Sequence, residues 1–189
     1  MDWSRSRRRT TIKALLTVLI TLTLLAPSAG QTGVFLPEDV VPRMAEASPG
    51  PEIETTDVTE ELLRLTNQAR SQRGLASLTL SPALARAASD HAGQMVELNY
   101  FSHSSPVPGQ RTTRQRVRRH GKNPQKLSEN IFECTGYELT QVAELALESF
   151  LGSPEHRANL LDPKATHLGL GVSRRGNRVL VSQVFASGL

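Results

Sequence analysis

The fold is indicated most clearly by HLGLGVSRRGNRVLVSQVFAS, residues 167–187. Two apolar runs, HLGLGVS (167–173) and RVLVSQVFA (178–186), flank RRGN (174–177), which is a turn signal containing glycine. Runs of this kind on either side of a short turn predict an antiparallel β-hairpin. Patterns typical of helices fill most of the chain before it, so we predict an α+β fold with a small sheet rather than a βαβ repeat.

The helical patterns begin at DVTE (57–60), which has the form of a capping box with Asp57 as N-cap, and Gly74 is expected to end this first helix. Ser81-Pro82 and Ser153-Pro154 each predict a helix start, because serine caps a helix and proline fits its first turn. The other expected elements are a short basic helix in TTRQRVRRHG (112–121), a strand or a turn in ENIFECTG (129–136), and a helix capped by Thr140.

The first thirty residues have the three-part layout of a secretory signal peptide. A basic region, SRSRRRTTIK (4–13), precedes an apolar run, ALLTVLITLTLLA (14–26), and PSAGQ (27–31) indicates cleavage after Ala29 or Gly30. The apolar run is shorter than the about 20 residues of a membrane-spanning helix, although an uncleaved anchor is the alternative. Residues 1–30 are therefore predicted to be a signal peptide, residues 31–56 a Pro- and acid-rich linker, and residues 57–187 a single domain.

Charge and cysteine content narrow the possible functions. The 189 residues carry a net charge of +4, but the positive excess lies in residues 1–30, and residues 31–189 hold as many acidic as basic side chains. This balance argues against a general nucleic-acid binder. Cys134 is the only cysteine, so no internal disulfide can form, and we expect Cys134 to be a buried small apolar residue. An exported domain without disulfides must be held by its core or by a bound ion.

Three residues far apart in the sequence form the candidate site. His103 ends NYFSH as the chain leaves a helix, Glu129 lies in LSENIF, and His156 lies in the first turn of the helix that Ser153-Pro154 starts. Two imidazoles and a carboxylate are the protein ligands of many catalytic zinc sites. The same groups could instead carry out acid–base chemistry without a metal, and their spacing does not decide whether they share a site.

Five blocks carry a resemblance to a known family: LLRLTNQARSQRGLASLTLSPALARAASDHAGQMVELNYFSHSS (62–105), SENI (128–131), FLGSPEHRANLLDP (150–163), HLGLGV (167–172) and VSQVFA (181–186). In this order they resemble the bacterial branch of the CAP superfamily, which comprises cysteine-rich secretory, antigen 5 and pathogenesis-related-1 proteins and is also called SCP-like. The resemblance covers about residues 57–187. It implies an α-β-α sandwich with a small central antiparallel sheet flanked by helices.

The resemblance also implies a cleft of two histidines and two acidic residues that holds a divalent metal such as zinc in some members. By motif position, His103, Glu129 and His156 match three of these four residues. The second acid has no secure match, because Ser153 falls near its position, and Glu148 or Glu155 would have to replace it.

Two functions of different classes follow from these residues. The first is a non-enzymatic module, secreted or held in the periplasm or cell envelope, whose His/Glu cleft binds Zn²⁺ or another divalent metal, an unknown small ligand or an envelope component. The second is a metal-assisted or acid–base hydrolase of peptide or cell-wall material, with His103, Glu129 and His156 as its catalytic residues. We expect a monomer that binds no nucleic acid and contacts a membrane only through its signal peptide during export.

Four other features lie outside this candidate site. His91 lies on the inward face of its helix and is expected to be a packed core histidine, and Gln183 is expected to make a polar contact inside the sheet. Ser104 or Ser105 as a nucleophile is a third, weaker hypothesis. The basic segment 111–126 is expected to be a solvated face paired with nearby acids, or alternatively a surface that docks to an anionic envelope polymer or lipid.

Overall fold

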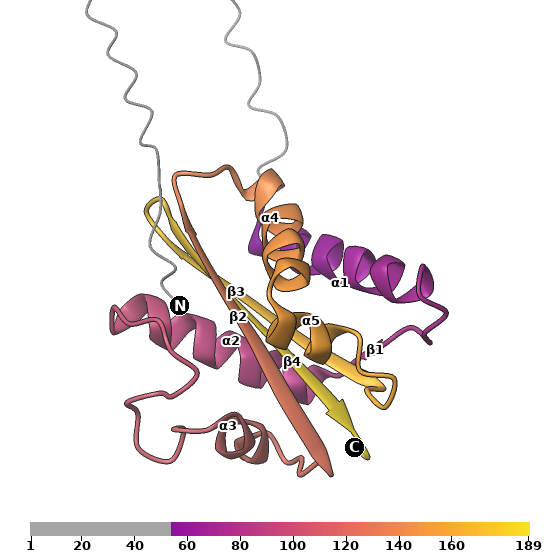
Figure 1. Cartoon of the computed structure of the whole chain (residues 1–189). Helices are drawn as coiled ribbons and strands as arrows, with labels where there is room; N and C mark the ends of the chain where they lie inside the picture. The colour runs from indigo at the N-terminus through magenta and orange to yellow at the C-terminus, as the bar shows by residue number, and fades with distance from the viewer. Residues whose placement is uncertain (1–53) are drawn as a thin grey trace, which may run out of the picture. The chain divides into compact units, whose positions relative to one another are not determined.

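A computed structural model describes residues 54–189, so the predicted signal peptide and nearly all of the predicted linker lie outside the described residues. The elements are α1 (Thr55–Ser71), β1 (Thr79–Leu80), α2 (Pro82–Glu97), α3 (Thr113–Arg119), β2 (Lys126–Thr135), α4 (Leu139–Gly152), α5 (Pro154–Leu160), β3 (His167–Arg175) and β4 (Arg178–Ser187) (Figure 1). Within residues 54–189, no helix has both the length and the apolar content that a membrane crossing requires.

The sheet is built around the predicted hairpin. β3 and β4 pair antiparallel from His167 opposite Ala186 to Arg175 opposite Arg178, with the turn between them. β2 pairs antiparallel with the other side of β4, and the short β1 pairs parallel with β3. The order β1-β3-β4-β2 makes β4 a central strand and β2 an edge strand.

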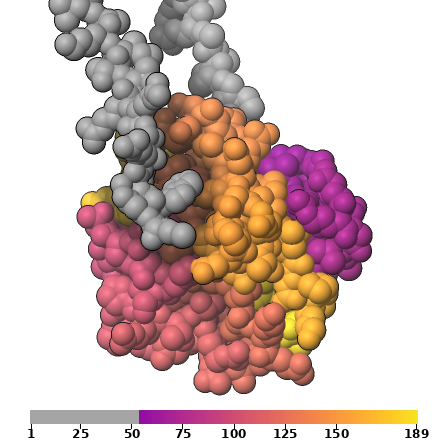
Figure 2. All heavy atoms as spheres, in the orientation of Figure 1, coloured from indigo at the N-terminus to yellow at the C-terminus, as the bar shows by residue number. Residues whose placement is uncertain are grey.

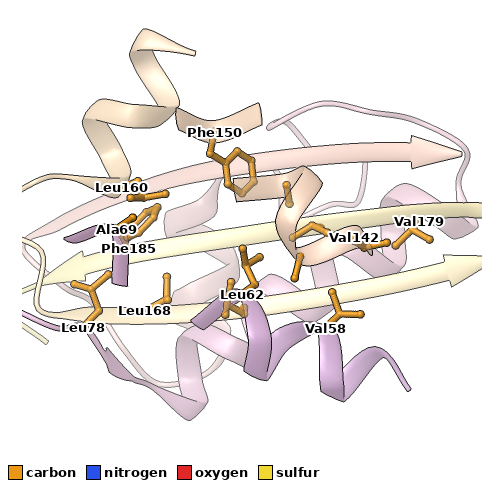
Figure 3. Packing of buried hydrophobic residues seen from close by; sticks show 14 of the residues in the cluster. Val58, Leu62, Ala69, Leu78, Val142, Phe150, Leu160, Leu168, Val179 and Phe185 are labelled. Atoms are coloured by element: carbon orange, nitrogen blue, oxygen red, sulfur yellow. The ribbon is translucent and has the colours of Figure 1, made fainter. Parts of the chain in front are cut away.

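Helices cover both faces of this sheet (Figure 1). α1, α4 and α5 pack on one face through the main hydrophobic cluster, to which Leu62, Phe150 and Phe185 belong (Figure 3). α2 and α3 pack on the other face, where Leu84 and Val117 belong to a second cluster with strand residues of β4. Because β4 is covered on both sides, its sequence is a nearly continuous apolar run. The predicted α+β class and α-β-α sandwich are confirmed.

Helix starts follow the predicted chemistry but not always the predicted residue. α5 begins as expected, with Ser153 as N-cap accepting a hydrogen bond from the backbone N–H of His156. α1 begins before the predicted DVTE cap, because Glu54 is the N-cap and Asp57 completes the capping box by accepting from the Glu54 backbone N–H at 2.9 Å. α4 has Glu138 as its N-cap, so Thr140 lies inside the helix and the predicted Thr140 cap is wrong.

Two predictions about single side chains are confirmed. Cys134 is buried and free. Gln183 is fully buried, donates to Thr66 Oγ1 at 3.0 Å and accepts from Asn130 Nδ2 at 3.3 Å. It therefore joins α1 to β2 by polar contacts on the face of the sheet that α1 covers.

Two glycines of HLGLGV allow α2 to lie directly on the backbone of β3. A Cβ placed on Gly169 would overlap the carbonyl carbon of Leu84, and a Cβ on Gly171 would overlap the backbone nitrogen of Ser89. The obstructing atoms belong to the helix backbone and cannot rotate away. Any side chain at either position therefore requires α2 to move from the sheet.

Replacement of Gly171 by alanine is expected to lower the free energy of unfolding by about 1–3 kcal/mol or more, because the added methyl group overpacks the α2–β3 contact. Urea unfolding followed by circular dichroism measures this change. Gly93→Ala is the matched control, since a Cβ there meets no atom within 4 Å. In the helix interior, alanine should leave stability unchanged or raise it by up to about 1 kcal/mol. Equal behaviour of the two variants would contradict the close contact.

Candidate functional site

The edge strand β2 joins the two helical layers through two consecutive residues. Neighbouring residues of a strand point to opposite faces of the sheet. Glu129 points to the face of α2 and α3, where its Oε1 accepts from Ser182 Oγ at 3.3 Å. Asn130 points to the other face and donates from Nδ2 to the backbone oxygen of His156 at 3.1 Å. The SEN sequence therefore contacts both layers at the same place along the edge.

His103 lies on the loop that follows α2 and meets Glu129. Its Nδ1 is 3.0 Å from Glu129 Oε2, and its side chain is 54% exposed while that of Glu129 is 3% exposed. When Nδ1–H donates to the carboxylate, the other ring nitrogen, Nε2, carries the lone pair. The carboxylate thus fixes the orientation of a histidine that solvent can reach, and this contact favours the tautomer with its proton on Nδ1.

His156 comes from the opposite layer and approaches His103. The centroids of the two rings are 6.3 Å apart, and the His156 ring also meets Phe150 edge-on at 5.6 Å. Burial, with the nearby His103 adding to it, lowers the pKa of His156. The buried Nδ1 of His156 has no hydrogen-bond partner within residues 54–189. His156 is therefore held as a neutral imidazole beside His103. In the space-filling view, the orange surface of α4 and α5 adjoins the rose surface of the layer that includes α2 (Figure 2).

Arg116 is a site residue that the sequence analysis missed. Its side chain is fully buried and donates to Glu129 Oε1 at 2.7 Å. It also donates to the backbone oxygens of His103, Gln110 and Arg111, so one guanidinium fixes the loop that carries His103. The prediction of a solvated basic face is wrong for Arg116, because it lies on the inward side of α3 next to the buried Val117.

His91 is also part of this cluster. It is fully buried, as predicted for a core histidine, and its Nδ1 is 3.4 Å from the hydroxyl of Tyr100. Its Nε2 lies 3.8 Å from Glu129 Oε2. Desolvation by burial lowers the pKa of His91 to about 4, against the attraction of Glu129. His91 is thus a neutral ring packed beside the buried Glu129. Its inward place on α2 predicts burial but does not predict this neighbour.

Glu129 is the charged centre of the cluster. Burial would raise its pKa, but the hydrogen bond from His103 and the positive charge of Arg116 outweigh burial and lower it. The carboxylate is therefore ionised, and its two oxygens are occupied by Arg116 and Ser182 on one side and by His103 on the other. Such a buried pair is held in place by its hydrogen bonds rather than by solvent.

The second acidic residue is not found beside the histidines. Ser153 caps α5, Glu155 is exposed, and Glu148 lines a separate hollow between β2 and α4. Among residues 54–189, no group of three or more His, Cys, Asp or Glu side chains is arranged to hold a metal ion. The structure thus brings His103 to Glu129 and His156 to His103, and none of the residues considered for the second acid lies with them.

An open hollow of about 600 Å³ lies beside the His103 loop, lined by residues such as Tyr100, Ser102, Ser104 and Arg111. His103, Glu129 and His156 are not among its lining residues, so it adjoins the cluster without containing it. Ser105 is buried and donates from Oγ to Gln94 Oε1 at 2.7 Å. This contact braces the loop, and it does not support the hypothesis of Ser105 as a nucleophile.

These features define an α-β-α sandwich whose edge strand carries a buried carboxylate in contact with His103 and, at the next residue, an amide that holds the backbone of His156. Residues 63–185 match the profile of the cysteine-rich secretory protein family, CAP. The chain belongs to this family, as its sequence blocks predicted, and it is of the bacterial type.

Three bacterial proteins illustrate the similarity. The chain is 34% identical over 142 residues to the uncharacterized membrane protein YlbC of Bacillus subtilis (strain 168). The matched region covers 75% of this chain and 39% of YlbC. It is 28% identical over 118 residues to YkwD of the same strain, covering 62% of this chain and 43% of YkwD. The chain therefore spans about two fifths of the length of these relatives. The crystal structure of an extracellular protein with an SCP domain from Bacillus anthracis str. Ames matches with a TM-score of 0.59 and 29% identity, over 72% of this chain and 44% of that one.

The ion pair of Arg116 and Glu129 predicts strong coupling between their substitutions. Arg116→Met leaves a buried carboxylate without its cation, and Glu129→Gln leaves a buried guanidinium, so each should cost about 3–5 kcal/mol of unfolding free energy. The double variant buries neither charge alone and should lose clearly less than the sum of the two. Urea unfolding of all four proteins measures the coupling, with the exposed Arg175→Met as control. Additive losses would show that the pair does not act as a unit.

Proposed function

We propose that this protein is a non-enzymatic binding module that acts outside the cytoplasm and uses His103 and His156 to hold a divalent metal ion such as Zn²⁺, to which a small ligand or envelope component binds. The observation that carries the proposal is the hydrogen bond between His103 Nδ1 and Glu129 Oε2 at 3.0 Å. A histidine that binds a metal through one nitrogen commonly donates its other N–H to a carboxylate, which fixes the ring and makes it a better ligand.

The donor set is compatible with such an ion. Each Zn–N bond is about 2.1 Å long, so two rings bound to one tetrahedral ion have centroids about 5.3 Å apart. The separation between the rings of His103 and His156 is 6.3 Å, so the half-exposed His103 on its loop has to move toward His156 by about 1 Å for both to bind one ion. The lowered pKa of His156 supports the proposal, because only a neutral imidazole has a lone pair to give.

In this proposal Glu129 orients His103 instead of acting as the third ligand. Both of its oxygens already accept hydrogen bonds, and Arg116 neutralises its charge. The protein would then supply two nitrogens, and the remaining coordination positions would be open to water or to oxygen atoms of a ligand. A two-histidine site binds an ion more weakly than a site with three protein ligands, and it leaves more of the ion accessible.

A hydrolase of peptide or cell-wall material is the second candidate, and the same contact favours it. An imidazole oriented by a carboxylate is the arrangement of a general base, and His103 is half exposed. A screen of peptides and peptidoglycan separates the two functions. Turnover by the parent that is lost in His103→Ala and in His156→Ala would establish the hydrolase, and turnover that survives both changes would exclude this site as its source.

Zn²⁺ is expected to bind one site on the purified untagged protein in a calorimetric titration. His103→Ala and His156→Ala should each abolish this heat, and Glu129→Gln should weaken binding by about 10–100-fold because the carboxylate no longer orients His103. His167→Ala is the control, since His167 lies at the start of β3 and takes no part in the cluster. Circular dichroism must show that each variant is folded. Unchanged affinity in both alanine variants would remove the metal proposal.

Export is supported by the layout of residues 1–30 and by the extracellular relative from Bacillus anthracis. Protein recovered from outside the cytoplasm is expected to begin near Gly30 or Gln31, which mass spectrometry of the intact chain would establish. Recovery of that protein with Met1 in place would contradict cleavage.

A further inference from the structure

Within residues 54–189, four arginines of the basic segment 111–126 form no ion pair with an acidic side chain: Arg111, Arg114, Arg118 and Arg119. The ion pairs of this segment within residues 54–189 are Arg116 with Glu129, His120 with Asp90, and Lys126 with Asp162. Arg114 and Arg118, one turn apart on α3, form none of these pairs. The expected pairing with nearby acids is therefore missing at these two positions.

A neutral amide holds these two arginines together. Asn123 Oδ1 accepts from Arg114 Nη1 at 3.0 Å and from Arg118 Nε at 3.1 Å. Arg114 is fixed further by the backbone oxygens of Pro124 and Gln125, at 2.8 and 3.4 Å. Because both nitrogens contact one oxygen atom, they lie no more than about 6 Å apart. Arg118 is exposed and keeps its two terminal nitrogens for another partner.

The hydrogen bonds to Asn123 do not remove the repulsion between the two positive charges, which is weak for such a pair and comparable in size to the attraction of one ion pair on a helix surface. Like charges four residues apart on a helix repel each other, and Asn123 supplies hydrogen-bond acceptance without a compensating charge. An aspartate at position 123 would satisfy both guanidinium groups and neutralise one of them. Arg118 in the last turn of α3 is favourable toward the helix dipole, whereas Arg114 lies in the first turn, where a positive charge is unfavourable.

We propose that Arg114, Arg118 and Asn123 form a binding site for the phosphodiester groups of an anionic polymer of the cell envelope. Guanidinium groups are matched to phosphate oxygens by their planar, paired N–H donors. Arg111, Arg119 and Lys122 are exposed in the same segment and offer charge to further repeats of the polymer. No large apolar side chain is exposed on α3 or on residues 120–125, which favours a polymer over insertion into a bilayer. The site shares no residue with the proposed metal site, although an envelope partner requires the export proposed above.

The decisive variant is Asn123→Asp, which places the missing negative charge inside the site without removing an arginine. It should fold with a melting temperature at or above that of the parent, because it adds an ion pair. Arg118→Gln removes one cation, and Arg175→Gln, which removes one exposed cation from the end of β3, is the control for net charge. The probe is poly(glycerol phosphate) labelled with a fluorophore, and the readout is fluorescence anisotropy at several salt concentrations.

The parent is expected to bind the polymer with an affinity that falls as salt rises, because binding releases counterions. Asn123→Asp and Arg118→Gln should each weaken binding by about tenfold or more and flatten the salt dependence, whereas Arg175→Gln should bind like the parent. Asn123→Asp binding as tightly as the parent would overturn the site. A loss in Arg175→Gln as large as in Arg118→Gln would also overturn it, because net charge alone would then explain binding.

Two further measurements identify the ligand. Vesicles of phosphatidylglycerol and a single-stranded oligonucleotide are titrated at the same phosphate concentration as the polymer. Binding that is strongest to poly(glycerol phosphate) supports the proposal. Tighter binding to the vesicles would assign the surface to a membrane, and tighter binding to the oligonucleotide would assign it to nucleic acid, and either result would overturn the polymer assignment.

Discussion

A carboxylate buried at the edge of a sheet needs a cation and hydrogen-bond donors, and the surroundings of Glu129 are organised to supply them. Arg116 comes from α3, Ser182 from β4 and His103 from the loop after α2. A single ionised side chain therefore fixes three segments that are distant in sequence. On the opposite face, Asn130 contacts the backbone of His156 and accepts from Asn159 at 3.0 Å, so the next residue of the same strand holds α5.

The parts of the fold that were predicted correctly depend on local signals. The hairpin follows from two apolar runs around a glycine turn, and α5 follows from Ser153-Pro154. The parts that were missed depend on contacts between distant residues. β1 has two residues, and only its parallel pairing with β3 makes it a strand. The start of α1 was placed too late because Asp57 fits either end of a capping box, and the choice of Glu54 as N-cap depends on the backbone that precedes the motif.

In the candidate site too, local motifs predicted some residues, and contacts between distant residues determined the others. His103, Glu129 and His156 were chosen by motif position, and the structure places His103 within reach of both of the others. Arg116 was missed because it stands among several arginines, and composition cannot tell which of them faces inward. The available signal was the position of Arg116 around the helix axis, because it stands next to Val117, the one apolar residue of α3, and that residue marks the inward side. Arg118, only two residues later, lies on the solvent side of the helix.

With a single cysteine, this domain has no covalent cross-link between helix and sheet, and the contact of α2 with Gly169 and Gly171 takes part of that role. The backbones are in contact there, so the helix cannot shift along the strand without steric overlap. α2 leads directly into the loop of His103, and the height of that helix above the sheet therefore sets where the imidazole can reach. Gly169 and Gly171, which have no side chains, thus help to set the geometry of the histidine pair through the position of α2.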